Sequence, residues 1–201
     1  MTPMHARALL VQRPPRWTSF EGVASQVPPA LRTWLTEPGL LTARIRDLCG
    51  EHMRFRMLGP LHGASLSAEL AARLGGADSR GLLREIEFRC RDERVLYART
   101  VLPDSTVRVH PWLAELGDSP IGESLRRAGG LLEREPIEYA ALPPDHELAL
   151  AAREVSTDPT NEPTWARRAV YRLDGRPILV QEVFLPALLR VQEAQTGHRP
   201  S

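Results

Sequence analysis

Apolar and polar residues alternate along two runs near the C-terminal end of the chain, and together these runs predict a β-hairpin. The runs span residues 165–173 and 176–186, and Asp174-Gly175 separates them. Asp-Gly is typical of a type I′ turn, because both central residues of that turn need a positive φ angle. With a two-residue loop, Leu173 lies opposite Arg176 and the pairing continues outward from there.

One face of this hairpin is apolar but carries two opposite charges at one end, because side chains alternate between faces along a strand. Its members are Arg167, Ala169, Tyr171, Leu173, Ile178, Val180, Glu182 and Phe184. The pairing places Arg167 opposite Glu182. A charged group on an apolar face is costly unless it is paired or binds a ligand, so Glu182 needs a partner.

Further alternating runs predict strands at residues 53–58, 82–89, 95–102 and 137–141. In the second of these, Glu85, Glu87 and Arg89 share a face that we expect to be solvated. The other face of the same run holds Arg84 among apolar residues. Arg84 is therefore a second charge on an apolar strand face.

Helical patterns cover residues 28–34, 42–49, 67–74, 119–128 and 147–154. The fourth has Ser119 as the expected N-cap, Pro120 at the first helical position and Gly129 just past the end. Strands that come as hairpins, with helices between them, favour an α+β fold with a single antiparallel sheet.

The chain of 201 residues is long enough for one domain with tails. We expect residues 1–22 to form a loose N-terminal arm, residues 23–189 a single domain, and residues 190–201 a polar C-terminal tail. Residues 143–163 are rich in Pro, Asp, Glu and Ala, and we interpret them as an inserted loop.

Composition argues against some classes of function but does not identify one. The net charge is +1, which gives no case for a nucleic-acid partner or a membrane surface. All 26 basic residues are Arg, which a coding bias explains for most of them. The two cysteines, Cys49 and Cys90, are far apart and lack metal spacing, and no signal peptide or membrane span is recognisable. We expect a cytoplasmic protein with reduced thiols.

Familiar catalytic motifs are missing from the sequence. The six histidines have no Cys or His partner at metal spacing, so no metal site is expected. There is no nucleophile-elbow, P-loop or dinucleotide-binding signature. What remains is the pair of charges on apolar strand faces. These charges allow two interpretations. Arg84 and Glu182 each have a structural partner, which for Glu182 would be Arg167, or they bind a common ligand in a closed pocket.

Several short segments resemble, in order, the motifs of bacterial chorismate pyruvate-lyases. The resemblance runs from about Trp34 to Pro186, and these segments carry it: Leu83-Arg84-Glu85-Ile86, Ala98-Arg99-Thr100-Val101-Leu102-Pro103, Ser119-Pro120-Ile121-Gly122, Arg134-Glu135-Pro136-Ile137-Glu138, Trp165-Ala166-Arg167-Arg168, Asp174-Gly175-Arg176-Pro177 and Gln181-Glu182-Val183-Phe184-Leu185-Pro186. Each motif is weak alone, and the ordered set is specific.

The resemblance implies a lyase that converts chorismate to 4-hydroxybenzoate and pyruvate early in ubiquinone biosynthesis, without a cofactor. It implies helices on one side of the sheet and an internal ligand pocket under helical flaps. By motif, Arg84 would bind the ring carboxylate and Glu182 would lie near the ring 4-oxygen. The backbone of Ile121 would touch the ligand carboxylate, and Leu41 would be a flap residue. The partners are then only substrate and product, and we expect a monomer.

Two alternatives stay open. The fold that the resemblance implies also serves as the effector-binding domain of some bacterial regulators, so a non-catalytic sensor of hydroxybenzoate-like molecules is one. A related chorismatase that makes another hydroxybenzoate is the other. The family often has Met where this chain has Leu41, and usually Leu where it has Ile121. The stretch at residues 143–163 is longer than we expect for the family and could reshape a pocket mouth.

Overall fold

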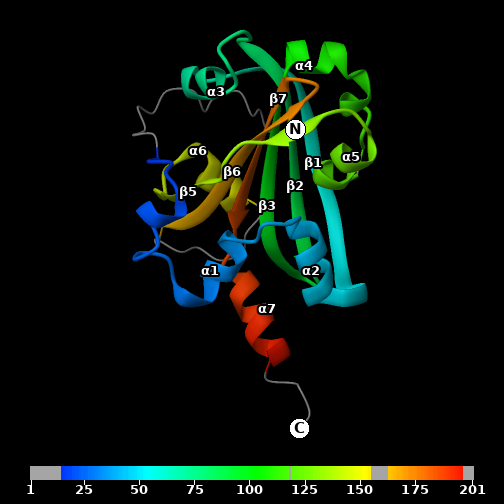
Figure 1. The fold of residues 1–201 in the computed structure, drawn as a ribbon. Coiled ribbons are helices and arrows are strands. Elements are labelled where there is room, and N and C mark those ends of the chain that lie inside the picture. The colour runs from blue at the N-terminus through cyan, green and yellow to red at the C-terminus, as the bar shows by residue number, and fades with distance from the viewer. Residues whose placement is uncertain (1–14, 118, 155–162, 197–201) are drawn as a thin grey trace.

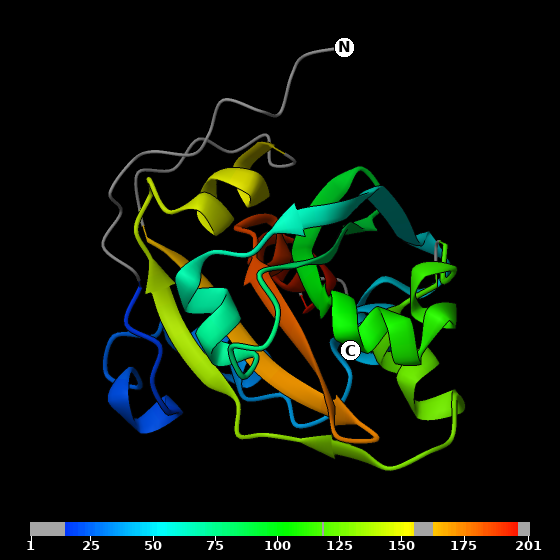
Figure 2. The same ribbon diagram turned by 90° about the horizontal axis from the view of Figure 1, so that it is seen from above.

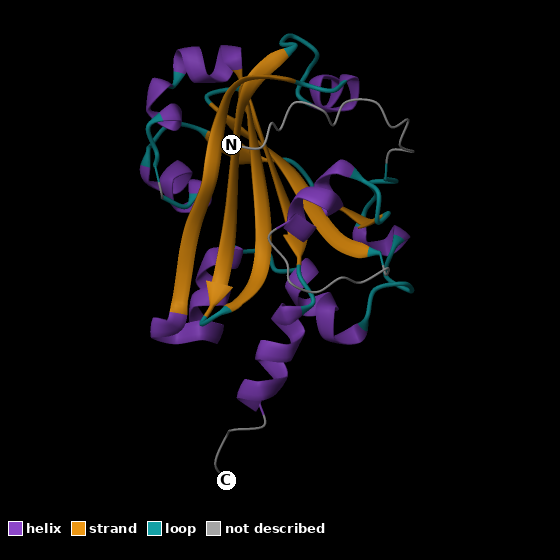
Figure 3. Ribbon diagram, turned by 180° about the vertical axis from the view of Figure 1, so that it is seen from behind, coloured by secondary structure: helices purple, strands orange, loops and turns teal. Residues whose placement is uncertain are grey.

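One antiparallel sheet forms the centre of the computed structural model, which describes residues 15–117, 119–154 and 163–196. Figure 3 shows the strands as a single layer with helices around it. The strands are β1 Met53–Ser65, β2 Arg80–Cys90, β3 Glu93–Pro103, β4 Leu132–Arg134, β5 Glu138–Leu142, β6 Thr164–Leu173 and β7 Arg176–Phe184. Their order is β1-β2-β3-β7-β6-β4, and β5 also pairs with β6.

Helices follow and separate the strands (Figure 1). The α-helices are α1 Pro29–Leu35, α2 Leu41–Cys49, α3 Ala68–Arg73, α4 Asp104–Val109, α5 Ile121–Arg127, α6 Glu147–Glu154 and α7 Ala187–Thr196. Short 3-10 turns are η1 Phe20–Gly22, η2 Gly50–His52 and η3 Pro111–Ala114. None of the helices in the described ranges is long and apolar enough to cross a membrane.

The hairpin of β6 and β7 forms as the sequence predicted. Asp174 and Gly175 have φ angles of 49° and 77°, as a type I′ turn requires. The register joins Leu173 with Arg176 and Arg167 with Glu182. Strand β7 then pairs with β3, so the hairpin completes the middle of the sheet.

Both faces of the sheet are covered by helices, as Figure 2 shows. The face that includes Glu182, here called the first face, packs against α1, α2, α5 and α7. On the second face, α3 contributes Leu70, and α6 contributes Leu148, Ala149 and Ala152. The α+β class and the antiparallel sheet are confirmed. The prediction of helices on one side of the sheet was incomplete, because α3 and α6 also cover the other side.

Helix α6 lies within residues 143–163, the segment interpreted as an inserted loop. Its residues Leu148, Ala149 and Ala152 are fully buried against Tyr97 and Val183 of the second face. Residues 155–162 lie outside the described residues. The expected domain limits themselves stay a prediction.

The N-terminal segment is packed where the structure describes it. Thr18 forms a β-bridge with Tyr139 of β5. Trp17 lies under the guanidinium of Arg168, at 4.3 Å from the ring centre. Residues 1–14 of the expected arm lie outside the described part of the chain.

Two expectations about charge and thiols were wrong. Glu87 is fully buried, with Nε of Arg94 3.0 Å from its carboxylate, so that face of β2 is not solvated. Periodicity shows which residues share a face, but it does not show what covers that face.

Cys49 and Cys90 form a disulfide, not two reduced thiols. The chain returns from the end of α2 along β1 and β2, which brings the two residues together.

Two helices begin at other positions than predicted. Pro120, not Ser119, is the N-cap of α5, while Gly129 has the expected left-handed φ angle of 69° just past its end. Leu40 is the N-cap of α2, two residues before the predicted start at residue 42. Both helices lie in the segments where the pattern placed them.

Candidate active site

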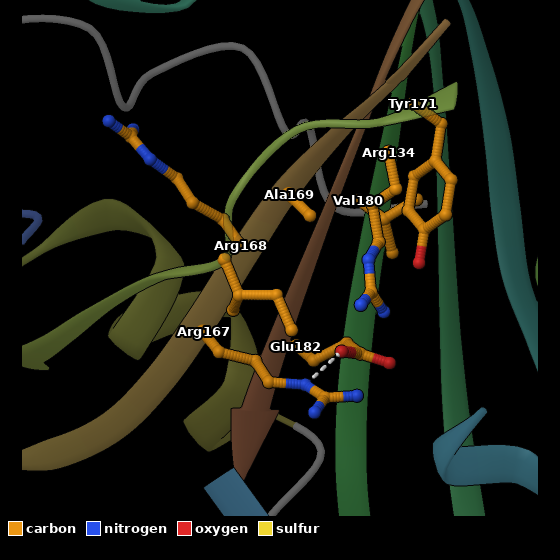
Figure 4. A pocket seen from close by; sticks show the side chains of 8 residues that line it. Arg134, Arg167, Arg168, Ala169, Tyr171, Val180 and Glu182 are labelled. Atoms are coloured by element: carbon orange, nitrogen blue, oxygen red, sulfur yellow. Dashed lines mark hydrogen bonds and ion pairs between the residues drawn. The ribbon is translucent and has the colours of Figure 1, made fainter. Parts of the chain in front are cut away.

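A narrow cavity lies against β6 and β7 on the first face. Its lining residues are Arg134, Ile137, Arg167, Arg168, Ala169, Tyr171, Val180 and Glu182. Figure 4 shows Arg167, Glu182 and Arg134 directed toward one another, while Arg168 points away. The interior holds little more than a water molecule, so a larger ligand requires the surrounding chain to move.

The Arg167–Glu182 pair is the most buried charged contact of this cavity. Nε of Arg167 lies 2.6 Å from the carboxylate of Glu182, and the two side chains are 5% and 20% exposed. Nη1 of Arg167 also donates to the carbonyls of Leu35 and Glu37, at 3.1 and 2.7 Å. Arg167 therefore holds Glu182 and the loop before α2 at the same time. The contact between Arg167 and Glu182 is a short charge-assisted hydrogen bond.

Tyr171 and Arg134 close the other side of the cavity and are paired in the register between β4 and β6. Burial raises the pKa of the Tyr171 hydroxyl, and the negative charge of Glu182 raises it further, while Arg134 opposes both. The hydroxyl thus stays neutral near pH 7 and can donate a hydrogen bond.

A second, larger cavity shares Arg134 and Tyr171 with the first and opens outward. It lies between the loop before α2 and the start of α5, where Leu40 and Gly122 line it. A Cβ atom on Gly122 would come within 2.7 Å of the Leu40 side chain, so the two segments approach each other closely here. The starts of α2 and α5 therefore form the rim of a common mouth.

The structure places two of the predicted site residues at this rim. Leu41 is the first residue of α2 and Ile121 the first residue of α5. Both are buried, and each follows or precedes a lining residue of the outer cavity. The expected flap and backbone contacts of these residues with a ligand stay predictions.

Arg84 shares the first face with Glu182 but lies farther along the sheet. It pairs with Thr100 of β3, which pairs with Val180 of β7, a lining residue of the inner cavity. Its guanidinium is buried, and Nη2 donates to the carbonyls of Gly117 and Ser119 at 2.8 and 3.2 Å. Among the described residues, it does not line either cavity wall.

The sequence motifs match a family model described as chorismate lyase over residues 15–194. The chain belongs to the chorismate lyase family. A probable chorismate pyruvate-lyase of Methylococcus capsulatus is 37% identical over 170 residues, covering 82% of this chain and 99% of that protein. One from Azoarcus sp. is 40% identical over 166 residues, covering 79% of this chain and 85% of that protein. The predicted family is confirmed.

Solved structures share the fold with this chain at low identity. The effector domain of PhnF from Mycobacterium smegmatis matches with a TM-score of 0.50 and 19% identity, covering 74% of this chain and 90% of that one. A PhnF C-terminal domain matches with a TM-score of 0.51 and 16% identity, covering 73% and 87%. At this identity the likeness shows the fold alone.

Two residues of the site had no predicted role. Arg134 stood within a family motif but was given no function, because β4 has only three residues and shows no periodicity. Tyr171 was assigned to an apolar face, and only the pairing with Arg134 shows that its hydroxyl faces the cavity junction.

Proposed function

We propose that this chain converts chorismate to 4-hydroxybenzoate and pyruvate at the two neighbouring cavities that share Arg134 and Tyr171, as an early step of ubiquinone biosynthesis. Membership of the chorismate lyase family supports the activity. The observation that supports the place is the Arg167–Glu182 pair, which sets a carboxylate into a narrow, mostly closed cavity on the sheet.

The reaction removes the proton on ring carbon 4 and breaks the bond between ring carbon 3 and the ether oxygen. The enolpyruvate that leaves takes up a proton and becomes pyruvate, while the ring becomes aromatic. Since aromatisation drives the reaction, the protein must chiefly fix the reactive conformer and exclude water. A charged Glu182 is suited to accept the proton or to hold the 4-oxygen.

In this proposal Arg84 binds the ring carboxylate. Its two carbonyl partners fix the plane of the guanidinium, which suits a carboxylate that approaches in that plane. The backbone at Ile121 touches the same carboxylate, and Leu41 covers the ligand from the start of α2. Substrate entry then displaces the loop at residues 36–40, whose carbonyls Arg167 and Arg134 hold.

Incubation with chorismate tests the function directly. We expect 4-hydroxybenzoate by chromatography and an equal amount of pyruvate by a coupled dehydrogenase assay. Arg84→Ala should lower turnover and product binding by roughly 30- to 1000-fold, the loss of one charge-assisted pair. Arg108→Ala, on the exposed side of α4, is the matched control. Pyruvate at the spontaneous rate would refute the lyase, and 3-hydroxybenzoate would identify a related chorismatase.

A sensor is the second candidate, since the fold resembles the PhnF effector domain. A sensor would bind 4-hydroxybenzoate without consuming chorismate, so the same incubation separates the two functions.

We also propose a monomeric, cytoplasmic protein. Light scattering checks the mass of 22.5 kDa. The Cys49–Cys90 disulfide is unusual for a reducing compartment. Cell fractionation with immediate thiol trapping therefore tests the location and the state of the two cysteines together.

A further inference from the structure

Arg134 is the cationic residue at the junction of the two cavities, and no role is yet assigned to it. It ends β4 and lines both the inner and the outer cavity. Its Nη1 donates to the carbonyl of Pro38, at 2.9 Å, in the loop before α2. Figure 4 shows its guanidinium directed into the inner cavity toward Glu182.

The side chains directed into the inner cavity carry more positive than negative charge. Arg134 and Arg167 face a single carboxylate there, Glu182, so these three groups carry a net charge of +1. Excess charge of one sign in a partly buried site favours a ligand of the opposite charge. With the ring carboxylate at Arg84, the enolpyruvyl carboxylate of chorismate would balance this charge, whereas 4-hydroxybenzoate has no second carboxylate to do so.

The strand order places Arg84 and Arg134 on opposite sides of Glu182. Arg84 is on β2, Glu182 on β7 and Arg134 on β4, and β7 lies between the other two strands. In chorismate the ring carboxylate lies opposite carbon 4, while the enolpyruvyl ether is attached to the neighbouring carbon 3. If carbon 4 faces Glu182 and the ring carboxylate faces Arg84, the enolpyruvyl group projects to the side where Arg134 lies.

We propose that Arg134, with the neutral hydroxyl of Tyr171 beside it, binds the enolpyruvyl carboxylate of chorismate at the junction of the two cavities. This inference rests on the proposed lyase function. A guanidinium binds a carboxylate through two parallel hydrogen bonds, which a backbone carbonyl cannot match. Arg134 therefore exchanges the Pro38 carbonyl for the substrate, and this exchange loosens the loop at the mouth.

Substrate and product differ in the carboxylate that Arg134 is proposed to bind, and this difference provides the test. In Arg134→Gln we expect kcat/KM for chorismate to fall about 10- to 100-fold, the effect of losing one charge-assisted pair. The Kd for 4-hydroxybenzoate, measured by calorimetry, should change less than about two-fold, because the product lacks the enolpyruvyl group. Arg134→Lys should recover part of the activity, and Arg108→Gln should match the wild type.

Three outcomes would overturn the inference. Equal losses in kcat/KM and in product affinity would mean that Arg134 binds the ring carboxylate or only supports the fold. An unchanged kcat/KM would mean that it does not touch the substrate. A wild-type protein without chorismate turnover would refute the lyase function and this inference with it. If only this inference fails, the wild type still turns over chorismate. The failure then shows in the ratios of kcat/KM and of product Kd between Arg134→Gln and the wild type.

Discussion

Replacing Glu182 separates a chemical role from a structural one, because Arg167 depends on the same carboxylate. Glu182→Gln keeps the shape of the side chain and removes its charge. The Arg167 guanidinium, 5% exposed, then loses its charged partner but keeps the carbonyls of Leu35 and Glu37. Glu182→Asp keeps the charge and withdraws the carboxylate by one methylene group.

The magnitudes follow from this geometry. A hydrogen bond to a charged group contributes about 1.5–3 kcal/mol, and the 20% exposure of Glu182 allows water to replace part of it. We therefore expect the free energy of unfolding of Glu182→Gln to fall by about 2 kcal/mol, which lowers Tm by roughly 4–8 °C for a domain of this size. If Glu182 accepts the proton, kcat should fall about 100- to 10,000-fold, with KM nearly unchanged.

Steady-state kinetics with chorismate and thermal unfolding of the same samples measure both effects. Glu182→Asp should keep most of the Tm and still lose much of kcat, because the displaced carboxylate no longer reaches ring carbon 4. A Gln variant with kcat within about three-fold of the wild type would refute proton transfer and leave Glu182 as an orienting group. A Gln variant that keeps the wild-type Tm would refute the dependence of Arg167 on this charge.

Other predictions concern the scaffold and the turnover. Cys49→Ser opens a link between residues 41 positions apart and should cost about 4 kcal/mol under oxidising conditions, with no loss in reductant; calorimetry in both buffers checks this. Burial alone would raise the pKa of Glu138, but hydrogen bonds and charges from Arg73 and Arg168 lower it overall. Its stabilising effect is therefore present above its unfolded pKa of about 4.3 and is lost as pH falls through the folded pKa. Urea unfolding should show Glu138→Gln less stable than the wild type at pH 7, with the gap narrowing below about pH 4. Gly81→Ala would bring Cβ within 2.4 Å of the Leu102 carbonyl oxygen and should lower Tm by several degrees. The proposed function places the product behind the loop before α2, so rapid mixing should show a burst before the steady rate; a linear course would refute slow release.

The hairpin could be predicted from sequence because its determinants are local. Asp174-Gly175 fixes the turn, and the turn fixes the register through to Arg167 and Glu182. The relation of Arg84 to Glu182 is different. Both were recognisable as charges on apolar faces, but their shared face depends on β7 pairing with β3, across about eighty residues of chain. Strand order of this kind is a property of the whole sheet and leaves no local pattern.

The covering of the second face was missed for a related reason. Charged residues along β2 suggested solvent, yet α3 and α6 pack over this side of the sheet and Glu87 is buried. The pairing of Cys49 with Cys90 likewise depends on the path of β1 between them. Local patterns predict elements and faces, whereas contacts between distant segments decide burial and pairing.

Arg167 and Arg168 show how a buried charge at a binding site differs from one that only supports the fold. They are neighbours in β6 and point to opposite faces. On the second face, Arg168 belongs to a network of three arginines and three glutamates, all in ion pairs of 2.7–2.9 Å: Arg73, Arg168, Arg172, Glu69, Glu135 and Glu138.

That network is balanced, so it needs no ligand and can contribute to stability by itself. On the first face, Arg167 and Arg134 are directed into the inner cavity with Glu182 as the one carboxylate beside them, which leaves an excess of one positive charge. Both faces hold arginine in the same strand at nearly the same depth. Under the proposed function, this excess of positive charge, rather than the presence of buried charge, favours the first face as the side that binds an anionic substrate.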